Sequence, residues 1–189
     1  MEAAQRQREE YTAIRATIRE RGTARIVLVP LVFIGWAGTA VATAAIITVA
    51  ISTLVPLLVL AAGFEAVFAL HLNVERIGRY LQAFHETDGG WEHIAMQYGE
   101  RFPGSSPDPL FARLFVMAAS VNFIPAALGG EPWEVVIVVA LHLLFINRIR
   151  MGRAFAATQR AADLGRFVEL RDPGDGGAGG RGVQHGDTE

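Results

Sequence analysis

The sequence contains no cysteine and no lysine. The absence of cysteine excludes disulfide bonds, thiolate metal sites and cysteine nucleophiles. All 17 basic residues are therefore arginine, which we attribute to genomic base composition rather than to a need for bidentate recognition of carboxylates or phosphates. These absences narrow the chemistry that is open to the chain before any motif is considered.

Several motifs that carry chemistry are also missing. The sequence has no phosphate-binding loop, no dinucleotide-binding glycine pattern, no nucleophile elbow and no EF-hand loop. Its basic residues are outnumbered by 19 acidic ones and the net charge is −2, so nucleic-acid binding has no support. We therefore expect no catalytic residues, no cofactor, no bound metal and no nucleic-acid partner.

What the sequence has in abundance is apolar residues, which make up 51% of the 189 residues and give a mean hydropathy of +0.30. No ionisable side chain occurs between residues 26 and 64. At ~1.5 Å of rise per residue this run is much longer than one ~30 Å bilayer crossing requires. We predict two transmembrane helices, at about 26–48 and 54–73, because the only turn chemistry in the run lies between them. The charged stretch before the run argues against a secretory signal peptide.

Two further apolar runs follow a polar loop. They predict spans at about 110–128 and 133–149, separated by a short Gly-Pro turn. The fold class is thus all-α: a polytopic membrane protein with four transmembrane helices as two hairpins, and with cytoplasmic helical extensions at its N- and C-termini. The bilayer is the first expected partner of the chain.

The arginines predict the orientation. They cluster before the first span, between the second and third spans, and after the fourth, whereas neither short outer turn contains one. The positive-inside rule therefore places both termini and the central loop in the cytoplasm, and we expect a multi-pass protein of a bacterial inner membrane. The predicted order is a polar helix (1–25), a transmembrane hairpin (26–73), a helix extension and loop (74–109), a second hairpin (110–149), a helix (150–171) and a disordered glycine-rich tail (172–189).

One stretch of the central loop keeps an apolar stripe. Trp91, Ile94 and Tyr98 fall at helical spacing within the Gly- and Pro-rich segment 86–109. Two interpretations stay open for this short segment. It lies at the level of the lipid headgroups, where Trp and Tyr are favoured, or it caps the helical bundle.

Four polar residues inside the predicted spans form a candidate intramembrane site: Glu65 and His71 in the second span, Asn122 in the third and His142 in the fourth. Counting ~1.5 Å per residue from each span's start puts Glu65 and His142 at similar depths, so the two side chains are predicted to be able to meet. Such a pair either fastens two helices together or moves protons or a cation. We favour the fastener, and Asn122 is an ordinary candidate for interhelical hydrogen bonding.

A metal-binding alternative rests on the loop string from His85 to His93, which contains two histidines and three carboxylates. Those groups suit zinc or a non-haem metal. Their spacing matches no established metal motif, and two adjacent glycines interrupt the string. Solvated loop chemistry is the better interpretation, so a membrane metalloenzyme is the least favoured reading.

The sequence leaves two main classes of function open. In the first, the chain is a non-enzymatic membrane component whose cytoplasmic helices bind a protein partner. In the second, it is a small transporter or channel that uses Glu65 with His142. Small residues in the first span, including Gly35 and Gly38, suit close helix packing within the chain first and homo-oligomerisation second.

Overall fold

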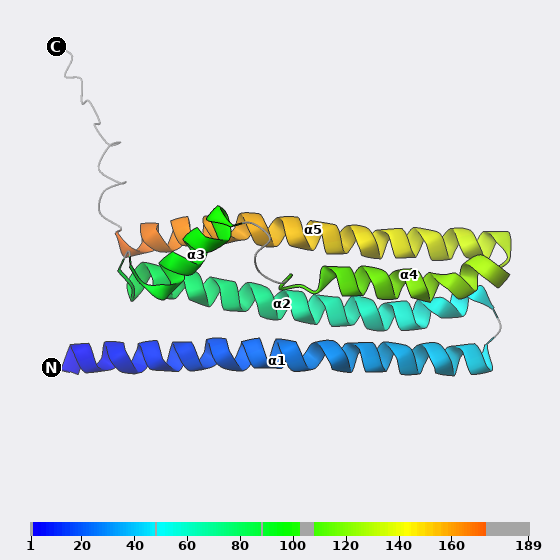
Figure 1. Cartoon of the computed structure of the whole chain (residues 1–189), viewed down its shortest axis with the longest axis horizontal. Helices are drawn as coiled ribbons and strands as arrows, with labels where there is room; N and C mark the ends of the chain where they lie inside the picture. The colour runs from blue at the N-terminus through cyan, green and yellow to red at the C-terminus, as the bar shows by residue number, and fades with distance from the viewer. Residues whose placement is uncertain (1, 48, 88, 103–107, 173–189) are drawn as a thin grey trace, which may run out of the picture.

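The structure, a computed structural model, describes residues 2–47, 49–87, 89–102 and 108–172. Every element within these residues is helical, and none is a strand. The elements are α1 (Glu2–Ile46), the 3₁₀ turn η1 (Ala50–Thr53), α2 (Leu54–Phe84), α3 (Trp91–Arg101), α4 (Ala112–Gly129) and α5 (Pro132–Arg171) (Figure 1). Four helices are long and apolar enough to cross a membrane: α1, α2 with η1, α4 and α5. The all-helical prediction with four such segments is confirmed, and the predicted tail lies outside the described residues from 173 onward.

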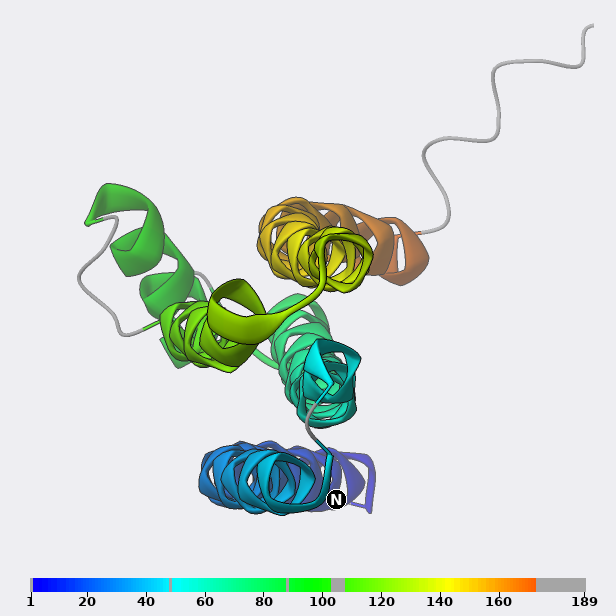
Figure 2. The same ribbon diagram turned by 90° about the vertical axis from the view of Figure 1, so that its right-hand side faces the viewer.

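Helix α2 is the central element. It packs against α1 on one side and against α4 and α5 on the other, as the end-on view in Figure 2 shows. Helix α1 is peripheral, since 11% of the residues in its most apolar stretch are buried, compared with 44% for α2. The remaining surface of α1 is therefore free to face lipid.

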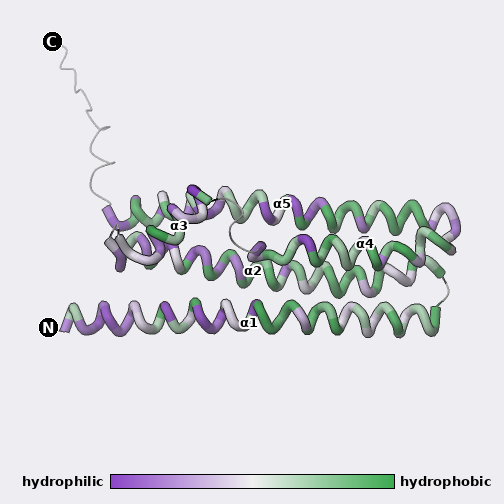
Figure 3. The backbone as a smooth tube through the Cα atoms, in the orientation of Figure 1, coloured by the Kyte–Doolittle hydropathy of each residue, from purple (hydrophilic) through white to green (hydrophobic). Residues whose placement is uncertain are grey.

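The described chain has an apolar end and a polar end (Figure 3). Helices α1, α2 and α5 pass without a break from the apolar segments into the polar end, where both ends of the described chain lie (Figure 1). Helix α3 lies there too, within the Gly- and Pro-rich segment 86–109, and it contains the apolar stripe of Trp91, Ile94 and Tyr98. We call this end the polar module. It comprises residues 2–25 of α1, 74–84 of α2, 150–171 of α5, and α3.

The core between the apolar segments is built on an aromatic cluster. Phe64 of α2 is completely buried, and its ring meets Phe115 of α4 and Phe145 of α5 edge-on, with centroids 5.5 and 6.3 Å apart. On the other side of α2, Gly63 lies against Val32 of α1 so closely that a Cβ on the glycine would overlap the valine side chain. Glycine thus sets the distance between α1 and α2.

At the apolar end, one carboxylate joins the connection between α1 and α2 to the connection between α4 and α5. Glu134 in the first turn of α5 is buried, and its Oε2 accepts hydrogen bonds from the backbone N–H of Glu131 and of Ala50, each at 3.3 Å. The first bond belongs to a capping box that starts α5, and Pro132 fills the position where a missing N–H is tolerated. The second bond holds η1 against the start of α5.

Candidate functional site

A buried polar cluster, the Asn122 hub, connects all four apolar segments. The side chain of Asn122 in α4 donates from Nδ2 to the backbone oxygen of Thr53 at 2.8 Å and to Nε2 of His142 at 3.2 Å. Its Oδ1 accepts from the indole Nε1 of Trp36 in α1 at 3.3 Å. The contacts engage both amide hydrogens and the amide oxygen of one side chain. Asn122 thereby links η1, α1 and α5 to α4.

The hydrogen-bond partners define the protonation state of His142. Nδ1 lies 2.8 Å from the carbonyl oxygen of Val138, which only accepts, so Nδ1 carries the proton. Nε2 faces the amide nitrogen of Asn122, which only donates, so Nε2 is the acceptor. The imidazole is neutral and both of its nitrogens are engaged. This arrangement suits a fastener between helices better than a group that takes up and releases protons.

Glu65, which directly follows the uncharged run 26–64, pairs with Arg148 of α5. The guanidinium Nη2 donates to Oε2 at 2.7 Å, and the guanidinium lies over the Phe68 ring with its carbon 4.8 Å from the centroid. The side chains are 49% and 39% exposed, respectively. The negative charge of Glu65 is thus balanced by the positive charge of Arg148, and part of this ion pair remains on the surface of the bundle.

Glu65 and His142, which the sequence predicts to be able to meet, form hydrogen bonds with different partners in the structure. The hydrogen bonds of Glu65 lead to Arg148, and those of His142 lead to Asn122 and Val138. Arg148 follows His142 by six residues, about 9 Å further along the helix axis. The two predicted members of one site therefore belong to two separate clusters.

His71, the remaining candidate, is buried at the junction with the polar module. Nη1 of Arg25 in α1 lies 3.1 Å from its Nδ1 and donates to it, because arginine has no acceptor. One turn further along α2, Glu75 accepts from Nε of Arg160 in α5 at 2.7 Å. These contacts connect α1, α2 and α5 where the apolar segments end.

The loop string considered for metal binding is occupied by arginine contacts. Nη2 and Nη1 of Arg15 in α1 pair with Glu86 and Glu92 at 3.1 and 3.0 Å. Glu86 also accepts a hydrogen bond from the backbone N–H of Glu92 at 2.8 Å. Over the described residues, no group of three or more His, Asp or Glu side chains is arranged to hold a metal ion. Asp88 lies outside them.

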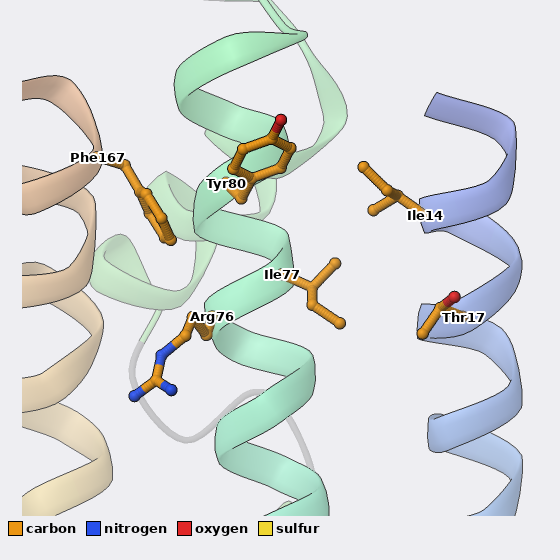
Figure 4. Close-up of a pocket in the computed structure, with 6 residues that line it drawn as sticks. All are labelled: Ile14, Thr17, Arg76, Ile77, Tyr80 and Phe167. Atoms are coloured by element: carbon orange, nitrogen blue, oxygen red, sulfur yellow. The ribbon is translucent and has the colours of Figure 1, made fainter. Parts of the chain in front are cut away.

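An open apolar groove of about 310 Å³ crosses the polar module. Its floor is formed by α2, and its walls are formed by α1 and α5 (Figure 4). We call it the α1–α5 groove. It is lined by Ile14 and Thr17 of α1, Arg76, Ile77 and Tyr80 of α2, and Phe167 of α5.

Ion pairs and rings fix the shape of this groove. Arg76 at its floor donates from Nε to Asp163 of α5 at 3.3 Å, and the ring of Tyr80 meets that of Phe167 edge-on at 5.8 Å. The hydroxyl of Tyr80 donates to Oε1 of Glu10 in α1 at 2.8 Å. The two walls are thereby held to the floor rather than to each other, and the groove stays open between them.

The Tyr80–Glu10 contact predicts a loss of stability at high pH. The hydrogen bond to Glu10, with burial and the Glu10 charge, raises the pKa of Tyr80 above its ordinary value of 10.0. The unfolded chain therefore loses the Tyr80 proton at a lower pH than the folded chain does. The stabilisation from the Tyr80–Glu10 contact is complete below about pH 10, and it disappears as the pH rises through the higher pKa of Tyr80 in the folded state. Thermal unfolding in detergent from pH 8 to 11 should show a smaller decline for Tyr80→Phe than for the wild type. Tyr98→Phe is the control, and equal declines for wild type and Tyr80→Phe would contradict the prediction.

Sequence reasoning found Asn122 and Glu65 but missed their partners. Trp36 gives no signal, because an aromatic residue in an apolar run is ordinary. Arg148 is at the end of the predicted fourth span, where an arginine is expected to reach the headgroups. The α1–α5 groove was also missed, since it depends on α1 and α5 lying on either side of α2 (Figure 4).

Comparisons with known proteins give no further identification. No protein-family model, no curated protein and no solved structure matches the chain. The functional conclusion therefore depends on the geometry described above.

Proposed function

We propose that the chain is a non-enzymatic component of a bacterial inner membrane that binds a protein partner through its polar module. In this proposal the four apolar segments cross the bilayer as two hairpins. Both termini and α3 are cytoplasmic, because the arginines lie at the polar end and the positive-inside rule applies to them. The α1–α5 groove then opens toward the cytoplasm.

The observation that carries the proposal is the groove itself. Ile14, Ile77 and Phe167 give this groove an apolar lining on an otherwise charged module, and concave apolar surfaces are where partners and ligands bind. A groove between two helices, floored by a third, suits an amphipathic helix that places residues i, i+3 and i+7 inward.

The charges beside the groove define the partner more closely. Arg76 at the floor is 54% exposed, and Arg166, next to Phe167 on α5, is 64% exposed. Both contact Asp163, so one carboxylate is shared between two guanidinium groups. A partner helix with acidic residues on the side that faces Arg76 and Arg166 would complement these two exposed guanidinium groups.

Transport by a Glu65–His142 site is the alternative, and no specific observation favours it. Glu65 is engaged by Arg148, and the neutral His142 is engaged at both nitrogens. Neither group is arranged as an exchangeable proton carrier. We therefore place partner binding first.

The proposal is tested by crosslinking from inside the groove. A photoreactive amino acid at position 77 should capture one cytoplasmic or membrane protein in cells, at an acidic amphipathic helix identified by mass spectrometry. The same probe at Ile94, which is 50% exposed on α3, is the matched control. Capture of lipid alone, or equal capture from both positions, would contradict the proposal.

The captured helix then gives a quantitative prediction. Burying one isoleucine is worth about 1.5–3 kcal/mol, so Ile77→Asp should weaken binding of the synthetic helix at least about tenfold. Calorimetry on the purified chain in nanodiscs measures this change. Ile94→Asp should leave the affinity unchanged, and a partner that binds Ile77→Asp as tightly as the wild type would rule out the groove.

A further inference from the structure

The Glu65–Arg148 pair lies on an apolar surface. Leu58 is two turns before Glu65 on the same face of α2 and is 69% exposed. Leu144 is one turn before Arg148 on the same face of α5 and is 62% exposed. The partly exposed charges of Glu65 and Arg148 are thus surrounded by exposed leucine side chains, which favour contact with hydrocarbon. We call this surface the Glu65–Arg148 face.

Such a surface is poorly matched to the hydrocarbon of the bilayer, although Arg148, at the end of the predicted fourth span, is also within reach of the headgroups. Charged side chains within membrane spans almost always face the interior of a bundle, a water-filled cavity or one another. Glu65 and Arg148 face one another, as this rule requires. However, the described residues leave 49% of the Glu65 side chain and 39% of the Arg148 side chain uncovered. A protein surface that supplies charges of both signs would cover the remainder.

We propose that a second copy of this chain covers the Glu65–Arg148 face, so that the protein associates as a two-fold dimer in the membrane. The face is self-complementary, because it carries one positive and one negative charge. In a two-fold contact, Arg148 of one copy meets the partner's Glu65, and the reverse contact forms by symmetry. A partner with charge of only one sign would repel one member of the pair.

The depth of the two charges satisfies the geometry that a membrane dimer requires. Copies inserted in the same orientation are related by an axis along the membrane normal, which leaves the depth of every residue unchanged. Glu65 and Arg148 lie at the same depth, since their side chains are 2.7 Å apart. Rotation about that axis therefore brings unlike charges to the same level.

The arginine retains the capacity for a second carboxylate. A guanidinium has five N–H donors, and over the described residues one of them, on Nη2, binds Glu65. Stacking over the Phe68 ring, 4.8 Å from its centroid, limits the movement of the guanidinium. The donors are thus held on the surface of the bundle, and the dimer does not depend on the partner proposed for the α1–α5 groove.

Charge exchange between copies tests the proposal. Glu65→Arg places two positive charges on the face, and Arg148→Glu places two negative ones. In liposomes at a fixed protein-to-lipid ratio, energy transfer between labelled copies should show dimers for the wild type and at least tenfold weaker association for each variant alone. An equimolar mixture should recover association as a heterodimer. Monomeric wild type, undiminished single variants, or a mixture that does not recover would each overturn the proposal.

A second measurement avoids any doubt about folding of the charge variants. The chain has no cysteine, so Leu144→Cys introduces a single thiol on the proposed interface. This variant should form disulfide-linked dimers in the membrane under mild oxidation. Val41→Cys, at a 71% exposed position on α1, is the matched control. Crosslinking of the control as fast as of Leu144→Cys would show random collision and reject the interface.

Discussion

Replacing Gly63 by valine should destabilise the bundle by about 1–3 kcal/mol, the usual cost of overpacking a close-packed core. A Cβ at this position would overlap the side chain of Val32, including its Cβ, so α1 and α2 must move apart. Small residues at helix interfaces allow the close backbone approach that stabilises membrane bundles, and this is the approach that valine removes. Thermal unfolding in detergent measures the loss.

Two further variants make this result specific. Gly38→Val on the same pair of helices is the matched control, because nothing lies within 4 Å of a Cβ built on Gly38. Val32→Ala removes the two Cγ atoms that come closest to a Cβ on Gly63 and should restore part of the stability lost by Gly63→Val. Equal losses for the two glycine substitutions would mean that helix propensity, rather than the contact between α1 and α2, causes the effect.

Asn122→Leu should cost about 2 kcal/mol of stability. The substitution removes three interhelical hydrogen bonds at ~0.6 kcal/mol each on average, those with Trp36, Thr53 and His142. It also leaves the indole N–H without its acceptor in an apolar environment. Chemical or thermal unfolding in the same detergent measures the change.

The matched control for the Asn122 hub is Ser120→Ala, two residues earlier on α4. Ser120 is exposed, and its hydroxyl donates only to the backbone oxygen of Val116 in its own helix. We expect little change from this substitution. Loss of stability from Ser120→Ala as large as that from Asn122→Leu would show that polar groups stabilise α4 itself rather than its contacts with the other helices.

The spans were predictable because they follow from composition. The uncharged run from residue 26 to 64 is too long for one crossing and predicts two apolar helices, and the structure separates two such helices at η1. The loop is rich in glycine and proline, yet the helical spacing of Trp91, Ile94 and Tyr98 marks the stretch in which the structure forms α3 (Trp91–Arg101). Local composition describes the ends of that segment better than its middle.

The polar contacts were less predictable than the helices. Depth can be counted along a span, and that count placed Glu65 near His142. It ignores the length of an arginine side chain and the rotation of each helix about its axis. The structure shows Arg148 reaching Glu65 from six residues beyond His142. The rotation of each helix about its axis decides which polar groups meet. A helix that is apolar on all sides contains little information about that rotation.

Finally, the continuity of α1 through the polar end has a mechanical consequence. At ~1.5 Å of rise per residue its 45 residues span about 68 Å, and Pro30 inside the helix removes one backbone hydrogen bond two residues before Val32. With α2 as its main neighbour, α1 would pivot at the tight Gly63–Val32 contact if it tilted. A tilt of ~5° in the bilayer displaces the far end by several ångströms, by the length of the arm. In a bilayer whose thickness alters helix tilt, such a displacement would load the Tyr80–Glu10 and Arg15–Glu86 contacts that hold α1 beside α2, and only their rupture would change the width of the α1–α5 groove.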